Sequence, residues 1–395
     1  GIVPASQTGS PITSDGWTTD NWGEILLSCP KNGGIYQWRP SSGFVNSQLV
    51  PNAPPFNGGI FVSMPAQILV AWGSVSSGVE QDPMTVRWSD QEDFENWTVT
   101  STTQAGSYRI PRGSMIVGGL QAPQQSLLWT DLGLCALVYQ GPPFVFGFNE
   151  IMTGCGLIGA HAACVMRGGV YWMGTSNFFV LLGSGPQSIP CSVWDVVFQN
   201  IDTGNQYKCV AAANSTFDEI AFYYPSLSGG TGEIDSYVKY NIEDKSWDYG
   251  TLQRTAWVDQ SVLGQPIGTT AQGVIYQHET SPDADNQPLL ASFTTGWFAI
   301  SEGQSLSFVD WFFPDMKWKY FNGSSSASIK ITIEATDYPN QTPRVYGPFT
   351  VNDAKEFVNT RLRGRLIRLT YASFDIGSWW RLGSQRYRTA PDGRR

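Results

Sequence analysis

Charged residues are scarce in this sequence. Asp, Glu, Lys and Arg make up 14% of the 395 residues, whereas about a quarter is usual for soluble domains. Aromatic residues reach 13%, and aromatic side chains are enriched where proteins meet. We therefore expect neighbouring proteins to cover much of the surface. Hydrophobic residues make up 41% of the chain, which is ample for a packed core and excludes a disordered protein.

Helical patterns and long apolar runs are also missing. Apolar residues do not recur at the three- and four-residue spacing of an amphipathic helix behind a capping residue. No apolar run approaches the roughly 20 residues that span a bilayer, and the first residues of the sequence do not have the pattern expected of a signal peptide. We expect an all-β protein that does not insert into a membrane.

Residues suited to catalysis or metal binding are few. The chain has two histidines, His161 and His278, and it lacks the common hydrolase, metalloprotease and nucleotide-binding motifs. Cys155, His161 and Cys164 are close in sequence, but their spacing matches no zinc pattern and a fourth ligand is missing. We expect no catalytic residue, no metal and no cofactor.

The six cysteines show no paired spacing. Each lies among apolar or small residues, where a free thiol packs like a small hydrophobic group. We expect six reduced thiols, and hence folding in a reducing compartment. The cysteines are Cys29, Cys135, Cys155, Cys164, Cys191 and Cys209.

Short strands separated by turns are abundant. Runs of four to seven residues are closed by Gly, Pro, Asn or Asp, as at 24–28, 67–72 and 134–139. The runs 86–90 and 238–241 each lead through an acidic turn to a Trp. Degenerate units of about forty residues with such hairpins are typical of β-propeller blades.

These patterns divide the chain into three parts. We predict an extended segment at 1–14, a β-propeller of about six blades at 15–282, and a C-terminal β domain with a basic tail at 283–395. The boundary lies in the polar, proline-containing stretch 280–288. Residues 328–334 alternate between apolar and polar, which predicts a half-buried strand of a small β-sandwich.

One predicted hairpin is flanked by two tryptophans, Trp88 and Trp97. We expect them to brace this blade by packing against each other as an aromatic pair. The acids nearby all lie in or near this one hairpin, whereas the paired carboxylates of a propeller glycosidase are expected from different blades. Exposed Trp and Tyr side chains can stack on sugars, so a carbohydrate-binding or glycoside-acting propeller remains an alternative. The acids are Glu80, Asp82, Asp90, Glu92, Asp93 and Glu95.

The sign of the charge is unevenly distributed. The formal net charge is −9, but residues 344–395 carry eleven basic and four acidic residues, a balance of +7 that leaves −16 for the remainder. A basic ending on an acidic body is suited either to assembly with an acidic partner or to binding a polyanion, and we favour an acidic protein partner.

Arginines alternate with other residues near this end. If Arg361, Arg363 and Arg365 lie on one strand, their guanidinium groups share a face, and a bulge at Gly364 would explain the change of phase that follows. Local ion pairs with Asp and Glu are the alternative role for these side chains. We predict an assembly interface formed by Arg361, Arg363, Arg365, Arg368 and Arg381.

Two stretches of the chain resemble one protein family. Residues 82–90 (DPMTVRWSD), followed by Asn96-Trp97 and by 104–107 (QAGS), are similar to a signature of the tail hub or nozzle proteins of short-tailed bacteriophages, the DNA-stabilisation proteins. The ending resembles that of the same proteins at 363–368, 379–383 and 393–395.

The resemblance implies a non-enzymatic virion protein with a β-propeller. Such a subunit forms a homo-oligomeric ring, six-fold in the best-known members of the family, below the portal and adaptor, where it retains packaged DNA and provides its exit channel. The implied partners are the adaptor or head-to-tail connector, tail spikes or fibres, and a needle or plug protein, with transient, non-specific passage of genomic DNA. The implied location is the phage tail, after synthesis in the host bacterial cytoplasm. An acidic body suits a DNA channel because it repels phosphate. A generic protein-interaction propeller is the third alternative.

Overall fold

The chain divides into two units, Gly1–Gln277 (unit 1) and His278–Arg395 (unit 2). The computed structural model describes residues 16–43, 45–75, 80–301, 303–320, 328–355 and 357–393. The predicted extended segment 1–14 lies outside the described residues. Regular structure is almost entirely β, with a short helix α1 and two 3-10 helices, η1 and η2, at Trp194–Phe198, Pro40–Ser42 and Gln206–Lys208.

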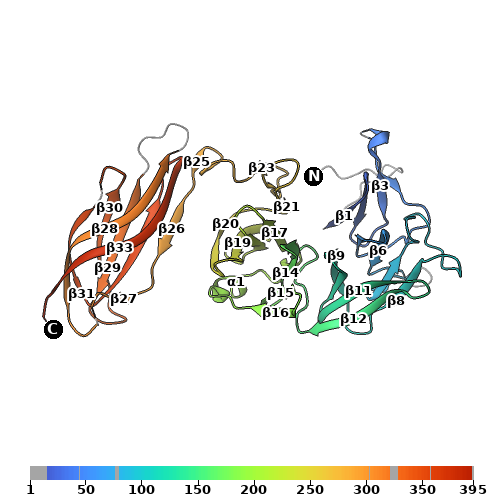
Figure 1. Cartoon of the computed structure of the whole chain (residues 1–395), viewed down its shortest axis with the longest axis horizontal. Helices are drawn as coiled ribbons and strands as arrows, with labels where there is room; N and C mark the ends of the chain where they lie inside the picture. Colours follow the sequence, from blue (N-terminus) through green and yellow to red (C-terminus); the bar gives the residue numbers. More distant parts are fainter. Residues whose placement is uncertain are drawn as a thin grey trace. The chain divides into compact units, whose positions relative to one another are not determined.

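The described part of unit 1 consists of six antiparallel sheets that follow one another along the chain (Figure 1). The first five have four strands each. The first sheet contains β1 (Trp17–Trp22), β2 (Ile25–Pro30), β3 (Tyr36–Trp38) and β4 (Gln48–Leu49). The second contains β5 (Gly59–Ser63), β6 (Ile68–Trp72), β7 (Thr85–Trp88) and β8 (Gly106–Arg109).

The later sheets of unit 1 repeat this order. The third contains β9 (Ile116–Gln121), β10 (Ser126–Thr130), β11 (Gly133–Gly141) and β12 (Val145–Thr153). The fourth contains β13 (Ala163–Met166), β14 (Gly169–Met173), β15 (Phe178–Leu182) and β16 (Gly185–Ile189). The fifth contains β17 (Val210–Asn214), β18 (Glu219–Pro225), β19 (Ile234–Asn241) and β20 (Trp247–Thr251). The sixth has three strands, β21 (Ala256–Val258), β22 (Ile267–Thr269) and β23 (Ile275–Gln277).

Four of the five pairs of consecutive sheets in unit 1 meet at their first strands, whereas the third and fourth sheets are in contact through β12 and β16. β1 lies beside β5, β5 beside β9, β13 beside β17, and β17 beside β21. The amide of Ile60 donates to Thr18 Oγ1 over 2.9 Å, and the amide of Val62 donates to the Asp20 carboxylate over 2.7 Å. Strands β5 and β6 are buried on both faces because hydrophobic clusters fill the space on either side of the second sheet. Four-stranded sheets packed in this way are the blades of a β-propeller, and the predicted all-β fold class is confirmed.

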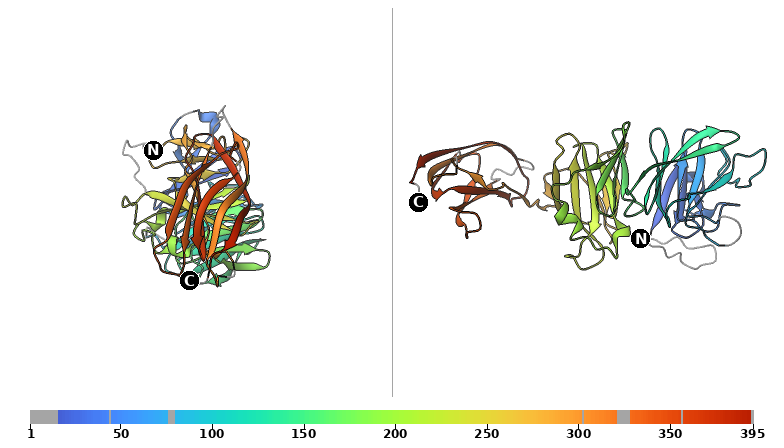
Figure 2. Two further views of the ribbon diagram at one scale, coloured as in Figure 1. Left: turned by 90° about the vertical axis from the view of Figure 1, so that its left-hand side faces the viewer. Right: turned by 90° about the horizontal axis from the view of Figure 1, so that it is seen from below.

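Unit 2 is built from two packed sheets. Their inner faces supply one core, in which Ile331 and Leu369 of the first sheet meet Phe312 and Leu362 of the second, as expected for a β-sandwich. The two layers are visible in the right-hand view of Figure 2. The first sheet has the order β26 (Ala291–Thr294), β32 (Leu366–Ser373), β29 (Ile329–Thr336), β30 (Arg344–Val351), with β27 (Phe298–Ala299) also on β32. The second has the order β31 (Val358–Gly364), β28 (Ser307–Tyr320), β33 (Ser378–Pro391), and a separate hairpin joins β24 (Asp283–Ala284) to β25 (Gln287–Pro288).

The change of phase near Gly364 is a change of sheet. Strand β31 ends at Gly364 in one sheet and β32 begins at Leu366 in the other. Arg365 is the corner residue, and its amide donates to Thr336 O over 3.0 Å. The predicted bulge is therefore wrong, because the chain leaves the first ladder here instead of inserting an extra residue into it.

Candidate functional site

The segment that resembles the phage family forms one hydrogen-bonded unit in the second sheet. Asp90 accepts a bond from the Gln104 amide over 2.7 Å and another from Asn96 Nδ2 over 3.2 Å. Ser89 Oγ accepts the Leu69 amide over 3.1 Å, which ties the turn to the central strand β6. These bonds link three parts of the motif that are separated in sequence, and they hold the long connection between β7 and β8.

Trp88 packs on the side of this sheet that faces the third sheet. Its indole nitrogen donates to Gln104 O over 2.8 Å, and its ring meets Phe146 edge-on at 5.3 Å. Gly106 lies directly opposite Trp88 in the ladder. A Cβ at Gly106 would come within 2.5 Å of the indole ring, so the motif needs glycine here to make room for the tryptophan.

Trp97 packs on the opposite side of the second sheet. It is 3% exposed and belongs to the cluster between the first and second sheets, where its indole nitrogen donates to Phe94 O over 2.8 Å. Trp88 belongs to a different cluster. The predicted packing of the two rings against each other is wrong, since Trp88 and Trp97 lie on different faces of the sheet. Arg87 precedes Trp88 and points to the other face of the sheet, where its Nη2 donates a hydrogen bond to Trp97 O over 3.4 Å.

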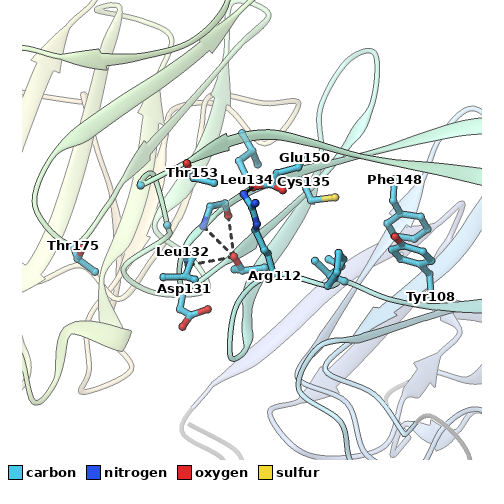
Figure 3. A pocket seen from close by; sticks show the side chains of 16 residues that line it. Tyr108, Arg112, Asp131, Leu132, Leu134, Cys135, Phe148, Glu150, Thr153 and Thr175 are labelled. Carbon is cyan, nitrogen blue, oxygen red and sulfur yellow. Dashed lines mark hydrogen bonds and ion pairs between the residues drawn. The ribbon is translucent and has the colours of Figure 1, made fainter.

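A pocket of about 690 Å³ opens in unit 1 between the second, third and fourth sheets. Its lining comes from β8, from the segment after it, from the β10–β11 turn and from β12. Figure 3 shows Tyr108 and Phe148 at one end and Thr175 at the other. The rings of Tyr108 and Phe148 stack with centroids 4.1 Å apart, and Tyr108 is 40% exposed.

The two carboxylates of this pocket are already engaged. Glu150 forms an ion pair with Arg112 at 2.9 Å. Asp131 accepts bonds from the hydroxyl and the amide of Ser114 over 2.6 and 2.9 Å. Burial acts to raise the pKa of Asp131, but the bonds from Ser114 and Met115 outweigh it and hold the pKa below its usual value. The pocket therefore presents Asp131, whose carboxylate form is favoured by these hydrogen bonds, and a Glu150 carboxylate that is paired with Arg112.

The cysteines form neither disulfides nor a cluster with other metal ligands. All six are free thiols, and the described residues contain no group of three or more His, Cys, Asp and Glu side chains that could hold an ion. Burial raises the pKa of Cys29 to about 12 and that of Cys155 to about 11. Neutral, buried thiols of this kind are unreactive packing groups.

The predicted arginine interface is only partly assembled on one face of unit 2. Arg361 and Arg363 alternate on the exposed side of β31, and Arg381 is exposed on β33 in the same sheet. Arg365 lies at the corner between the sheets, where its guanidinium group stacks on Tyr338. Arg368 belongs to the other sheet and pairs with Glu334 at 2.6 Å.

Sequence reasoning missed part of this face. Arg386 and Arg388 of β33 lie opposite Phe313 and Trp311 of β28. The alternation of these two arginines in the sequence could have predicted that they share one side of a strand. Their pairing with β28 could not have been predicted in this way, because it joins residues more than seventy positions apart.

No family model and no curated protein matches this chain. A solved exo-β-1,3-galactanase from Phanerochaete chrysosporium is similar at 10% identity, covering 97% of this chain and 100% of that chain with a TM-score of 0.34. Dihydro-heme d1 dehydrogenase NirN is similar at 11% identity, covering 91% of this chain and 70% of that chain with a TM-score of 0.42. Identities this low carry no activity over to this chain.

Within the described part of the chain, no helix is long and apolar enough to cross a membrane.

Proposed function

We propose that this chain is a non-enzymatic structural subunit of the tail of a short-tailed bacteriophage. In this proposal several copies form a ring-shaped nozzle, six-fold as in the best-known members of the family that the sequence resembles, below the portal and adaptor. The ring retains packaged DNA and provides its exit channel. Its partners are the adaptor, the tail spikes or fibres, and a needle or plug protein.

The observation that carries this proposal is the role of the matched motif. Trp88, Asp90 and Gln104 are joined by direct hydrogen bonds, and Gly106 is required by the Trp88 ring. The matched letters therefore belong to one packing unit of a blade, not to a reactive centre. A motif of this kind is expected in a family that shares a scaffold and not a reaction.

The charge of unit 1 supports the proposal. Residues 1–277 contain ten basic and 21 acidic residues, a formal charge of −11. A channel wall of the same sign as phosphate repels DNA and lets it slide, whereas a basic wall would hold it.

The test is the assembly state of the full chain. Sedimentation velocity over a wide range of concentration, with negative-stain micrographs of the same samples, should reveal a closed ring with a central channel. The proposal would be wrong if the chain remains monomeric at all concentrations and also fails to form rings when mixed with phage heads that carry an adaptor.

A second candidate function is saccharide binding in the pocket of unit 1. The partly exposed Tyr108 ring lies near the Arg112–Glu150 ion pair, and sugar sites combine aromatic faces with paired polar groups. A glycan array probed with the full chain tests this. Tyr108→Ala should abolish any signal, whereas Tyr249→Ala, which removes an exposed tyrosine on β20, should leave it unchanged. An array without any signal would remove this candidate.

A further inference from the structure

The outer face of the β31-β28-β33 sheet of unit 2 carries both cations and aromatic rings. Residues that lie opposite each other in an antiparallel ladder share a face. Arg363 lies opposite Phe308, Arg388 opposite Trp311, Arg386 opposite Phe313, and Arg381 opposite Lys317. The other face of the same sheet forms the core of the sandwich, so these side chains lie on its outside. We call them, with Arg361, Phe357 and Trp379, the basic-aromatic face.

The aromatic residues of this face form a patch that is partly exposed to solvent. Trp311 stacks on Phe313 with centroids 5.9 Å apart and contacts Phe357 at 6.1 Å. Phe357 is 45% exposed and Trp379 is 39% exposed. Exposed aromatic patches rimmed by polar groups mark contact sites, and Trp and Arg are the residues that dominate binding energy at protein interfaces.

The cations of the face are only partly neutralised within unit 2. Arg363 pairs with Asp392 at 2.5 Å and Arg388 pairs with Asp310 at 2.6 Å. Arg361, Arg381 and Arg386 form no ion pair with any residue that the structure describes. Three arginines are therefore available for carboxylates from outside the unit, which they can bind through two parallel hydrogen bonds.

The chain itself offers an acidic surface of the required sign. Unit 1 has a formal charge of −11, whereas unit 2, with 14 basic and 12 acidic residues, has +2. Exposed acidic turns of unit 1 include Glu92-Asp93 between β7 and β8 and Glu243-Asp244 between β19 and β20. A contact between unlike surfaces of two copies is heterologous, and heterologous contacts generate rings when the rotation closes.

We propose that the basic-aromatic face docks the acidic unit 1 of a second copy of this chain. The inference rests on the proposed ring and names the surface that forms it. Single-stranded DNA is the competing occupant, because rings and arginines also bind bases and phosphates. A second copy is favoured because each face is joined to a unit of charge −11, which opposes a polyanion and attracts a basic surface.

The experiment compares two sets of variants in the full chain. The triple variant Arg361→Gln, Arg381→Gln, Arg386→Gln removes the three unpaired charges of the face. Lys330→Gln is the control, because it removes an exposed cation from β29, in the other sheet of the same unit. Trp379→Ser tests the aromatic part. Circular dichroism checks that each variant is folded.

Sedimentation velocity measures self-association at about 0.1 M and about 1 M salt, since exposed charges are screened over this range. We expect the triple variant to associate at least about tenfold more weakly than the wild type at low salt, and the control to match the wild type. Wild-type association should weaken with salt, and Trp379→Ser should weaken association at both salt concentrations.

Three outcomes would overturn the inference, and they are distinguishable. If the wild type forms rings and the triple variant forms them equally well, the docking face is wrong while the ring stands. If the wild type associates neither alone nor when mixed with phage heads that carry an adaptor, both the ring and the docking of a second copy fail. If a labelled single-stranded oligonucleotide binds tightly to the wild type and the control but not to the triple variant, DNA is the occupant of the face.

Discussion

Asp90 and Gln104 are joined by a 2.7 Å hydrogen bond from the Gln104 amide to the Asp90 carboxylate, across fourteen positions of sequence. The same carboxylate accepts the Gln91 amide over 3.0 Å. This bond fixes the two ends of the long connection between β7 and β8 to each other. It also joins the two most recognisable parts of the matched motif.

Loss of this carboxylate should weaken unit 1. Asp90→Ala leaves the partly buried Gln104 amide without its acceptor, and hydrogen bonds to charged groups contribute about 1.5–3 kcal/mol each. We expect the free energy of unfolding to fall by about 2–3 kcal/mol, measured by urea denaturation followed by tryptophan fluorescence. Glu92→Ala, at an exposed position of the same turn, is the control and should change it by less than about 0.5 kcal/mol. Equal effects would show that the network contributes nothing.

A methyl group at Gly106 should be poorly tolerated. Its Cβ would lie 2.5 Å from the Trp88 ring, so the ring must move within a packed cluster. Overpacking of this kind costs about 1–3 kcal/mol, and we expect Gly106→Ala to be destabilised by that amount in thermal unfolding. A Cβ at Gly183 meets nothing within 4 Å, so Gly183→Ala should leave the melting temperature almost unchanged. An unaffected Gly106→Ala variant would contradict the packing described above.

Truncation of the two tryptophans should give additive effects. Trp97→Ala is expected to cost about 3–5 kcal/mol as a buried large-to-small change. Because Trp88 and Trp97 belong to separate clusters, the double variant Trp88→Phe, Trp97→Phe should equal the sum of the single variants to within about 0.5 kcal/mol. A coupling energy above about 1 kcal/mol in this double-mutant cycle would indicate that the two rings pack directly against each other, contrary to the structure.

The thiols should be present but unreactive in the folded protein. Burial raises the pKa of Cys29 to about 12, and burial with the Glu150 charge raises that of Cys135 to about 11. A raised pKa keeps the thiol protonated below that pH, so at pH 8 the reactive thiolate is scarce, and native labelling should speed up as the pH rises. Denaturation without reductant should release six titratable thiols. Recovery of four or fewer, or stoichiometric zinc, would contradict this expectation.

Local sequence was sufficient for several features of the fold. Short alternating runs closed by turn residues predict β-strands, because side chains alternate between the two sides of a strand. Residues 329–336 form β29 with the expected alternation of burial. The lack of cysteine pairing in the sequence also agrees with six free thiols in the structure.

Tertiary structure alone decided which side chains meet. Alternation predicts that Arg361 and Arg363 share a face, but only the end of β31 at Gly364 places Arg365 at a corner. Whether Trp88 and Trp97 touch depends on the path of the long connection between β7 and β8, and the sequence of one hairpin does not determine that path. Arg388 meets Trp311 through a ladder between distant strands. The two-residue alternation of a strand determines which of its side chains share a face. Which residues that face then contacts depends on the packing of strands that are distant in sequence.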